Sequence, residues 1–247
     1  TGVALATGEY IFHCDSDDFV DSDMLETLYD TAQKEKADIV WCDWFLSFEH
    51  TERYMKQPSY TTSTEALKAM LGGVMKFNVW NKLVRRGLYT DNHICFPEGY
   101  AMGEDMTMIL LFAVAANVVY VPRAFYHYVK LNSEAYSQNF SLHHLDSVKH
   151  NIHIVETFLQ EHFGNNLDLE IACMKLEAKF PFLMSNDKYM YKLWVETYPE
   201  ANIYIMRNHY ISNRRRLVQW CAYKHWWLMV RLHNWIVCKV VYGLIYR

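Results

Sequence analysis

An apolar run that ends abruptly in a cluster of acidic residues is the feature that most constrains how this chain can fold. Residues 8–13 read Gly-Glu-Tyr-Ile-Phe-His, and Asp15, Asp17 and Asp18 follow. The run predicts a buried strand that delivers an acidic loop to a sheet edge, where open α/β sheets bind ligands. Neighbouring carboxylates repel one another unless solvent or a cation compensates them. Mg²⁺ or Mn²⁺ is the natural candidate, because both take oxygen ligands and share them with substrate phosphates.

The same acidic residues also allow a simpler interpretation. Asp and Ser are favoured in turns and at the N-termini of helices, so the cluster can be a solvated turn that caps the next helix. On these residues alone, both interpretations stay open.

The residues around the cluster favour the first interpretation. From Ala6 to Val20 they read A-x-G-E-Y-I-x-x-x-D-S-D-D-F-V. This order resembles the nucleotide-sugar-dependent family 2 glycosyltransferases, and Asp15-Ser16-Asp17 matches their DXD motif. The resemblance implies an α/β fold of the GT-A architecture and an inverting transferase. It also implies that Asp15 and Asp17 hold Mg²⁺ or Mn²⁺ against the donor diphosphate, with Asp18 assisting or binding ribose.

A second acidic signal lies at Glu104 and Asp105, directly before an apolar stretch that predicts a helix. Acidic residues at a helix N-terminus are stabilised by the macrodipole, so an ordinary capping role is one interpretation. The resemblance implies another, in which Asp105 is the general base that deprotonates the acceptor and Glu104 is its partner.

Further candidates for the donor site are aromatic or basic. Residues 78–83 read N-V-W-N-K-L, a segment that resembles many bacterial members of the same family, and Lys82 beside Trp80 can place a positive charge near a phosphate. The alternative is a solvated lysine beside a buried tryptophan. The family resemblance adds pocket candidates near a Y-x-Y segment, namely Tyr126, His127, Tyr128, Ser133 and Ser137. We include His127 as a possible metal ligand, although a lone histidine in an aromatic strand is commonly structural.

The expected fold class is α/β, with a GT-A sheet that lacks its first strands and a C-terminal helical appendage. We predict three regions, namely 1–140 as the C-terminal part of the catalytic domain, 141–206 as the helical appendage and 207–247 as a basic aromatic tail. Periodicity and end signals predict helices near 24–36, 63–71, 141–159, 167–180 and 186–195, strands near 39–42, 117–121 and 124–129, and an irregular excursion over 45–62. In the resembled family about a third of the catalytic domain precedes the DXD strand, so we expect this chain to be a fragment without its own start.

Charge is distributed unevenly along the chain. The net charge of −4 divides into +8 after Glu200, where no acidic residue occurs, and therefore −12 for the first 200 residues. The tail combines these cations with Trp and Tyr, which favours contact with a membrane surface. Its polar residues leave no clean apolar stripe on a helical wheel, so a packed helix pair or an oligomer contact stays an alternative. Nucleic acid is not expected, because the acidic body would repel phosphates.

The leading functional prediction is a metal-dependent transferase that moves a sugar from a nucleotide-sugar donor, UDP-linked in the first instance, to a saccharide or lipid-linked acceptor. The alternative is a non-catalytic, truncated half of such an enzyme that binds a membrane or a partner. Six cysteines without a CxxC pair suit a reducing compartment and buried thiols. We therefore expect a cytoplasmic protein at the inner face of the plasma membrane.

Overall fold

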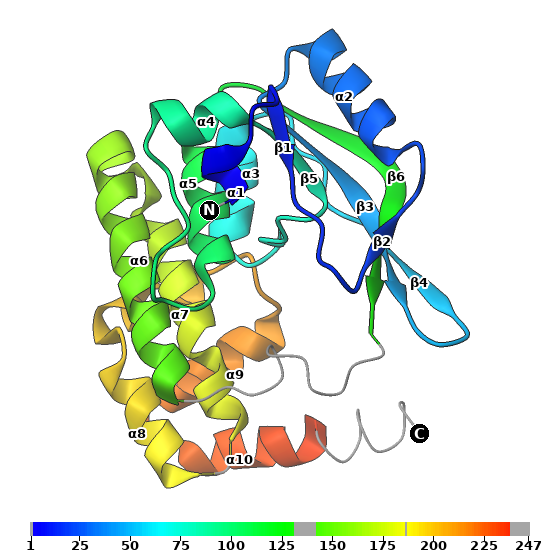
Figure 1. Cartoon of the computed structure of the whole chain (residues 1–247). Helices are drawn as coiled ribbons and strands as arrows, with labels where there is room; N and C mark the ends of the chain where they lie inside the picture. Colours follow the sequence, from blue (N-terminus) through cyan, green and yellow to red (C-terminus); the bar gives the residue numbers. More distant parts are fainter. Residues whose placement is uncertain (1, 131–141, 186, 238–247) are drawn as a thin grey trace. The chain divides into compact units, whose positions relative to one another are not determined.

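The computed structural model of the chain describes residues 2–130, 142–185 and 187–237 (Figure 1). These residues form two compact units, the first from residues 1–70 and 75–162 and the second from 71–74 and 163–247. The division falls at 162 rather than at the predicted 140, because the long helix after the sheet belongs to the first unit. Ser133 and Ser137 lie outside the described residues, as does the end of the tail from 238 onward.

A six-stranded mixed sheet forms the first unit. Its strands are β1 (Tyr10–Phe12), β2 (Phe19–Val20), β3 (Ile39–Ser47), β4 (Glu52–Met55), β5 (Lys82–Arg85) and β6 (Val118–Val129). The order is β1-β5-β3-β6-β2, with β4 paired to β3. Only β3 and β6 run parallel to one another among these pairs, and the register between them shifts on either side of Asp43. The strand predicted before the acidic loop is present as β1, but it is an outer strand in which only Ile11 is buried and Tyr10 and Phe12 are half-buried.

The prediction of an irregular excursion over 45–62 is wrong in its first half. β3 continues to Ser47 and forms a hairpin with β4, and β3 also pairs with β6 as far as Val129. The sequence there does not alternate between polar and apolar residues. Pairing with a neighbour on each side supplies the backbone hydrogen bonds that hold the segment extended despite that pattern.

Helices flank this sheet (Figure 1). They are α1 (Gly2–Leu5), α2 (Met24–Glu35), α3 (Ser63–Leu71), α4 (Arg86–Asp91), α5 (Gly103–Val114) and α6 (Leu142–Phe163). Helix α2 packs on β3 and β6. Helix α5 is buried from Met106 to Phe112, and the Phe112 ring meets Trp41 of β3 edge-on at 6.1 Å between centroids. This packing fixes the N-terminus of α5, where the second acidic pair lies.

The second unit is helical. It contains α7 (Asp168–Met184), α8 (Lys188–Glu196), α9 (Asn213–Tyr223) and α10 (Trp227–Ile236), with 3-10 turns η2 (Gly164–Leu167) and η3 (Pro199–Arg207). Buried Lys179 links α7 to the segment from the end of α8 into η3. Its ammonium donates to the carbonyls of Thr197 and Tyr198 and to the side chain of Asn202. The predicted helical appendage is therefore present.

None of the helices in the described ranges combines the length and the apolar character that crossing a bilayer requires.

The cysteine prediction is only partly right. Cys42, Cys173 and Cys221 are buried free thiols, whereas Cys14 and Cys95 are exposed. Burial raises the pKa of the Cys42 thiol to about 12. Cys238 lies outside the described residues.

Candidate active site

The acidic loop joins β1 to β2 and is anchored by Asp18. The Asp18 carboxylate accepts from the Tyr126 hydroxyl at 2.7 Å and from the Val129 backbone N–H at 2.8 Å. The backbone N–H of Asp15 donates to the same Tyr126 hydroxyl at 3.1 Å. Both carboxylate oxygens of Asp18 are thus used to hold the loop on β6, which favours a positioning role over direct contact with ribose.

Asp15 and Asp17 are arranged differently. Both side chains are exposed, and neither carboxylate has a hydrogen-bond or ion-pair partner in the part of the chain that the structure describes. Partial loss of solvent around the Asp15 carboxyl, and then the nearby charges of Asp18 and Asp17, raise its pKa. Two carboxylates are therefore presented to solvent with their oxygens free, as a hard cation needs.

Three aromatic rings, those of Trp80, Tyr126 and Tyr128, stack together, and Tyr126 contacts the loop. Trp80 is buried and stacks on Tyr126, with ring centroids 4.4 Å apart, and on Tyr128 at 5.6 Å. Burial and the charges of Asp18, Asp17, Asp15 and Glu104 raise the pKa of Tyr128. The Tyr128 ring thus lies within the field of both acidic motifs.

Lys82 does not reach toward the acidic loop as a free cation. Its side chain is 1% exposed, and its ammonium donates to the backbone carbonyls of Lys76 and Asn78 and to the side chain of Asn81, at 3.1, 2.5 and 2.8 Å. All three ammonium protons are used within residues 76–81. The alternative of a solvated lysine is therefore wrong, because the side chain is buried and its ammonium instead holds the loop that carries Trp80.

The second acidic pair lies in the first turn of α5, as the sequence predicts. Neither side chain caps the helix, because the N-cap position is Met102 and it makes no side-chain cap. Burial first, and then the neighbouring Glu104, raise the pKa of Asp105 to about 7, against the opposing charge of Lys76. Burial and Asp15 raise the pKa of Glu104, and Lys82 opposes that rise. The first acidic motif is thus close enough to the second to affect its ionisation.

His127 lies apart from this group. Its Nδ1 is 2.7 Å from Glu52 of β4 and its Nε2 is 3.2 Å from Asp21, just after β2. The ring is sandwiched between Phe19 and Phe45, at centroid distances of 4.3 and 4.9 Å. Both ring nitrogens therefore face carboxylates, and the prediction of His127 as a metal ligand gains no support from this geometry.

A divalent metal would have to be held by few protein groups. The described residues contain no group of three or more His, Cys, Asp or Glu side chains placed to hold one. Mg²⁺ is commonly bound through one or two carboxylates together with substrate phosphates, and Asp15 and Asp17 offer that set. The donor chemistry of the loop therefore fits a metal that is shared with a phosphorylated ligand.

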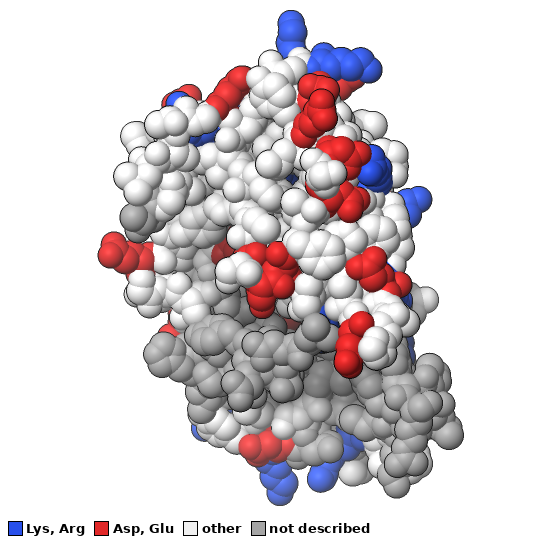
Figure 2. Space-filling model, turned by 45° about the vertical axis from the view of Figure 1, so that its right-hand side comes forward, with Lys and Arg blue, Asp and Glu red and all other residues white. Residues whose placement is uncertain are grey.

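Acidic side chains recur down the middle of the face shown in Figure 2, and Lys and Arg lie mainly at its margins. Several contacts of the candidate residues escaped sequence reasoning. Glu52 and Asp21 were not expected beside His127, and Lys76 was not expected near Asp105. Each pair joins segments far apart in the chain, so no local sequence signal could have found it.

The fold is of the GT-A type, the architecture of nucleotide-sugar transferases. The structure of S. aureus TarS 1-349 in complex with UDP-GlcNAc is similar over 95% of this chain and 69% of that chain, with a TM-score of 0.68 and 14% sequence identity. At this identity the similarity concerns the fold alone, and it confirms the α/β, GT-A prediction with a helical C-terminal part.

Residues 1–103 of the chain match the family model described as Glycosyl transferase family 2, which supports a family 2 glycosyltransferase. The Cholesterol galactosyltransferase of Borreliella burgdorferi is 30% identical over 195 residues, which cover 72% of this chain and 51% of that protein. Glycosyltransferase GlyG of Streptococcus pneumoniae is 27% identical over 153 residues, covering 57% and 50%. The chain thus spans about half the length of these curated relatives.

Proposed function

We propose that this protein is an inverting glycosyltransferase that moves a sugar from a nucleotide-sugar donor to a hydroxyl of a saccharide or lipid-linked acceptor. The observation that carries the proposal is the juxtaposition of two acidic motifs with different properties. One presents free carboxylates at Asp15 and Asp17, and the other presents Asp105 with a pKa raised to about 7. A transferase needs both, one to hold charge on the leaving nucleotide and one to take a proton.

The donor is proposed to lie at the acidic loop. Asp15 and Asp17 would hold Mg²⁺ or Mn²⁺, which when bound neutralises charge on the leaving diphosphate. Asp18 and Tyr126 keep the loop in place, since the loop is tied to β6 through both. UDP is the first nucleotide to test, because TarS 1-349 was solved with UDP-GlcNAc and the match to the family model supports a nucleotide-sugar donor.

Asp105 is proposed as the general base. A carboxyl whose pKa is about 7 is a better proton acceptor near neutral pH than one of ordinary acidity. It would take the proton of the acceptor hydroxyl while that oxygen attacks the anomeric carbon and the nucleoside diphosphate leaves from the opposite face. Glu104 supports this role through its charge, which helps to raise the pKa of Asp105.

A place at a membrane surface is also proposed, on the basis of α10. Its exposed side chains include Leu228, Leu232 and Trp235, whereas its polar residue Asn234 turns inward and donates to the carbonyl of Leu183. The expected lack of a clean apolar stripe stays a prediction, because the exposed Arg231 lies between Leu228 and Leu232 on the same face of the helix. Exposed apolar and aromatic residues beside cations suit a bilayer interface. The membrane surface proposed here is the inner, cytoplasmic face of the plasma membrane.

The competing function is a non-catalytic module that uses only this membrane or partner surface. It is favoured by α9 and α10, which pack as a helix pair in the second unit and still leave large apolar side chains exposed. It predicts that the acidic motifs can be altered without effect.

The test is release of UDP from a panel of UDP-sugars in the presence of Mn²⁺ and saccharide acceptors, for the wild type and for Asp105→Asn. We expect transfer to fall at least a hundredfold in the variant while donor binding is kept. Full activity of Asp105→Asn would overturn the assignment of the base. A wild type that transfers no sugar from any donor of the panel would favour the non-catalytic module.

A further inference from the structure

The turn that precedes α5 has a backbone conformation that its own sequence does not favour. Met102, the N-cap residue of this helix, has φ 58° and ψ 31°, in the left-handed region that glycine adopts without strain and most other residues avoid. Such a conformation persists only where surrounding contacts impose it, and it is common at functional sites. Glu104 and Asp105 follow within three residues, so the contacts that hold Met102 also direct the second acidic pair.

The contacts that hold this turn come from α6. Asn151 is buried, and its Nδ2 donates to the carbonyls of Ala101 at 3.0 Å and of Met102 at 3.2 Å. Ser147 is also buried, and its hydroxyl accepts from the backbone N–H of Ala101 at 3.3 Å. Ser147 and Asn151 are four residues apart and therefore lie on the same face of the helix. This face of α6 thus holds both residues that precede the first turn of α5.

Two further contacts restrict the same turn. The Tyr100 ring stacks on the ring of His150 of α6, with centroids 3.6 Å apart and 6° between the planes. Gly103, the first residue of α5, lies so close to Pro97 that a Cβ at this position would overlap the proline ring. In the part of the chain that the structure describes, no side chain caps this helix. The start of α5 therefore depends on α6 and on the loop before it.

Stability alone does not explain the Asn151 amide. Its Oδ1 is buried and has no hydrogen-bond partner among the described residues. An unpaired buried acceptor costs free energy, which offsets part of what the two hydrogen bonds of Nδ2 contribute. An amide nevertheless suits this position, because Nδ2 carries two protons and faces two carbonyls. The side chain thus matches the geometry of the turn more closely than the needs of an apolar core.

We infer that Asn151 is a positioning residue for the proposed general base, Asp105, and that Ser147 assists it. By holding Met102 in the left-handed conformation, Asn151 directs the first turn of α5 and with it the half-buried carboxyl of Asp105. A misplacement of about 1 Å at a reacting group is enough to lower a rate by about a hundredfold. The inference rests on the function proposed above, and it gives α6, which the sequence predicts as part of the appendage, a task in catalysis.

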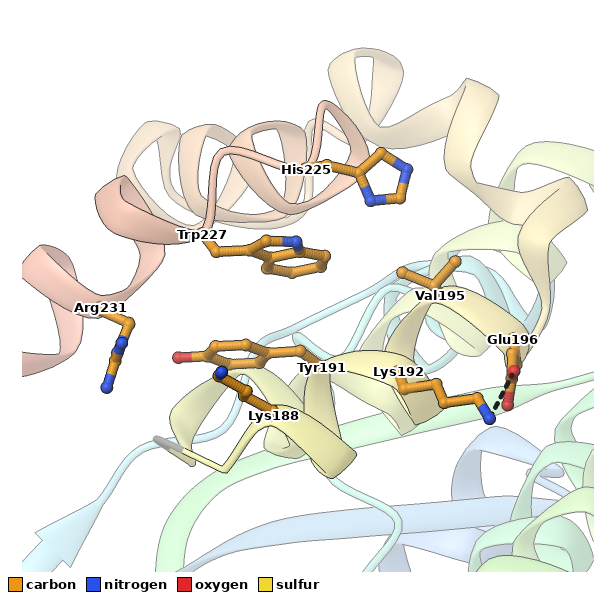
Figure 3. Close-up of a pocket in the computed structure, with 8 residues that line it drawn as sticks. All are labelled: Lys188, Tyr191, Lys192, Val195, Glu196, His225, Trp227 and Arg231. Carbon is orange, nitrogen blue, oxygen red and sulfur yellow. Dashed lines mark ion pairs between the residues drawn. The ribbon is translucent and has the colours of Figure 1, made fainter.

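The test compares Asn151→Ala with a matched change in the second unit, Asn234→Ala. Asn234 is also buried, and its Nδ2 also donates to two backbone carbonyls, those of Leu183 and Ser185. The helix that carries it, α10, lines a pocket of about 400 Å³ together with α8 (Figure 3), and Asn234 is not among the lining residues. Each variant therefore loses the donors of one buried amide, and only Asn151→Ala changes the start of α5.

The kinetic measurements are kcat and KM for the UDP-sugar that the wild type uses, with Mn²⁺, and unfolding in urea accompanies them. We expect Asn151→Ala to lower kcat about tenfold or more with KM within about twofold, and Asn234→Ala to change kcat by less than about twofold. Ser147→Ala is the milder variant in case Asn151→Ala does not fold. It should lower kcat about threefold, because the amide of Asn151 remains.

The pH profile separates positioning from general damage to the fold. Burial is the main cause of the raised pKa of Asp105, with the charge of Glu104 adding to it and that of Lys76 opposing it. A loosened turn admits water to this carboxyl. The midpoint of kcat/KM should therefore fall by about half a pH unit or more in Asn151→Ala and stay in place in Asn234→Ala.

Three results would contradict the inference. A kcat and a midpoint in Asn151→Ala that match those of Asn234→Ala would overturn it while leaving the proposed function intact. A fall in kcat with a matching rise in KM and an unchanged midpoint would overturn it as well, because the role of Asn151 would then be merely structural. Full activity of Asp105→Asn in the same assay would overturn the proposed base and this inference together.

Discussion

Asp105, the proposed general base, is a carboxyl whose ionisation carries a cost in stability. Its folded-state pKa, about 7, lies above its ordinary value of 3.8, so the folded protein binds this proton more tightly than the unfolded chain does. The resulting stability is fully present at low pH and is lost as the pH rises from about 4 to about 7. The ionised form that a general base requires is thus the less stable one.

The Asp105→Asn variant should therefore melt at a higher temperature than the wild type at pH 8, by about 2–5 °C, because the neutral amide avoids the burial of a charge beside Glu104. At pH 4, where the carboxyl is protonated, the two melting temperatures should agree. Thermal unfolding followed by circular dichroism at both pH values measures this. A variant that is equally destabilised at both would show that the burial and charge described for Asp105 are wrong.

The same carboxyl predicts how transfer depends on pH. Because the base acts only when ionised, kcat/KM should fall as the pH falls through about 7 and level off above it. Lys76→Met should move this midpoint upward, since Lys76 opposes the rise in the pKa of Asp105. A midpoint near 4 in the wild type would assign the base to another group.

Asp17 and Asp18 are adjacent carboxyls with different tasks, and a matched pair of variants separates them. Asp18→Ala removes the acceptor for the Tyr126 hydroxyl and the Val129 N–H and should lower the free energy of unfolding by about 2–3 kcal/mol. Asp17→Ala should change it by less than about 0.5 kcal/mol, because Asp17 is exposed and has no partner among the described residues. Urea unfolding measures both. Equal losses would mean that the loop is held in another way.

At the scale of single elements, the position of the acidic loop is fixed by long-range contacts with β6. β1 and α5 followed from local patterns, namely an apolar run before the acidic loop and an apolar stretch behind two acidic residues, whereas no strand was predicted at β2. The extension of β3 to Ser47 and its hairpin with β4 did not follow from local patterns, since β3 is held by β6, whose paired residues lie 79 to 82 positions later in the chain. Lys82 is a similar case, because a lysine beside a tryptophan does not reveal that three oxygens surround its ammonium.

Removal of the Lys82 ammonium should destabilise the loop of residues 76–81. Lys82→Met keeps the volume but leaves the oxygens of Lys76, Asn78 and Asn81 without their donor, which should cost about 2–3 kcal/mol of unfolding free energy. Lys34→Met is the control, since that side chain is 81% exposed. If Lys82→Met unfolded like the wild type and only weakened donor binding, the original phosphate-contact interpretation would be preferred.

At the scale of the whole molecule, the chain combines an acidic sheet unit with a basic helical end. The split of charge was evident from composition, and the GT-A fold followed from the DXD context. The pocket between α8 and α10 could not be predicted, because Lys188 and Tyr191 are more than 30 residues from Trp227 and Arg231 in sequence. The inward turn of Asn234 in α10 could not be predicted either, because only the packing against Leu183 reveals it.

The measurement that tests the central claim most directly is calorimetric titration of UDP, with and without Mn²⁺, into the protein and its Asp17→Asn variant. The account predicts binding that requires the metal in the wild type and is weakened at least tenfold in the variant, while the thermal stability of the variant is unchanged. Binding of UDP that is equally tight in Asp17→Asn, or that does not depend on Mn²⁺, would contradict a metal-assisted donor site at the acidic loop.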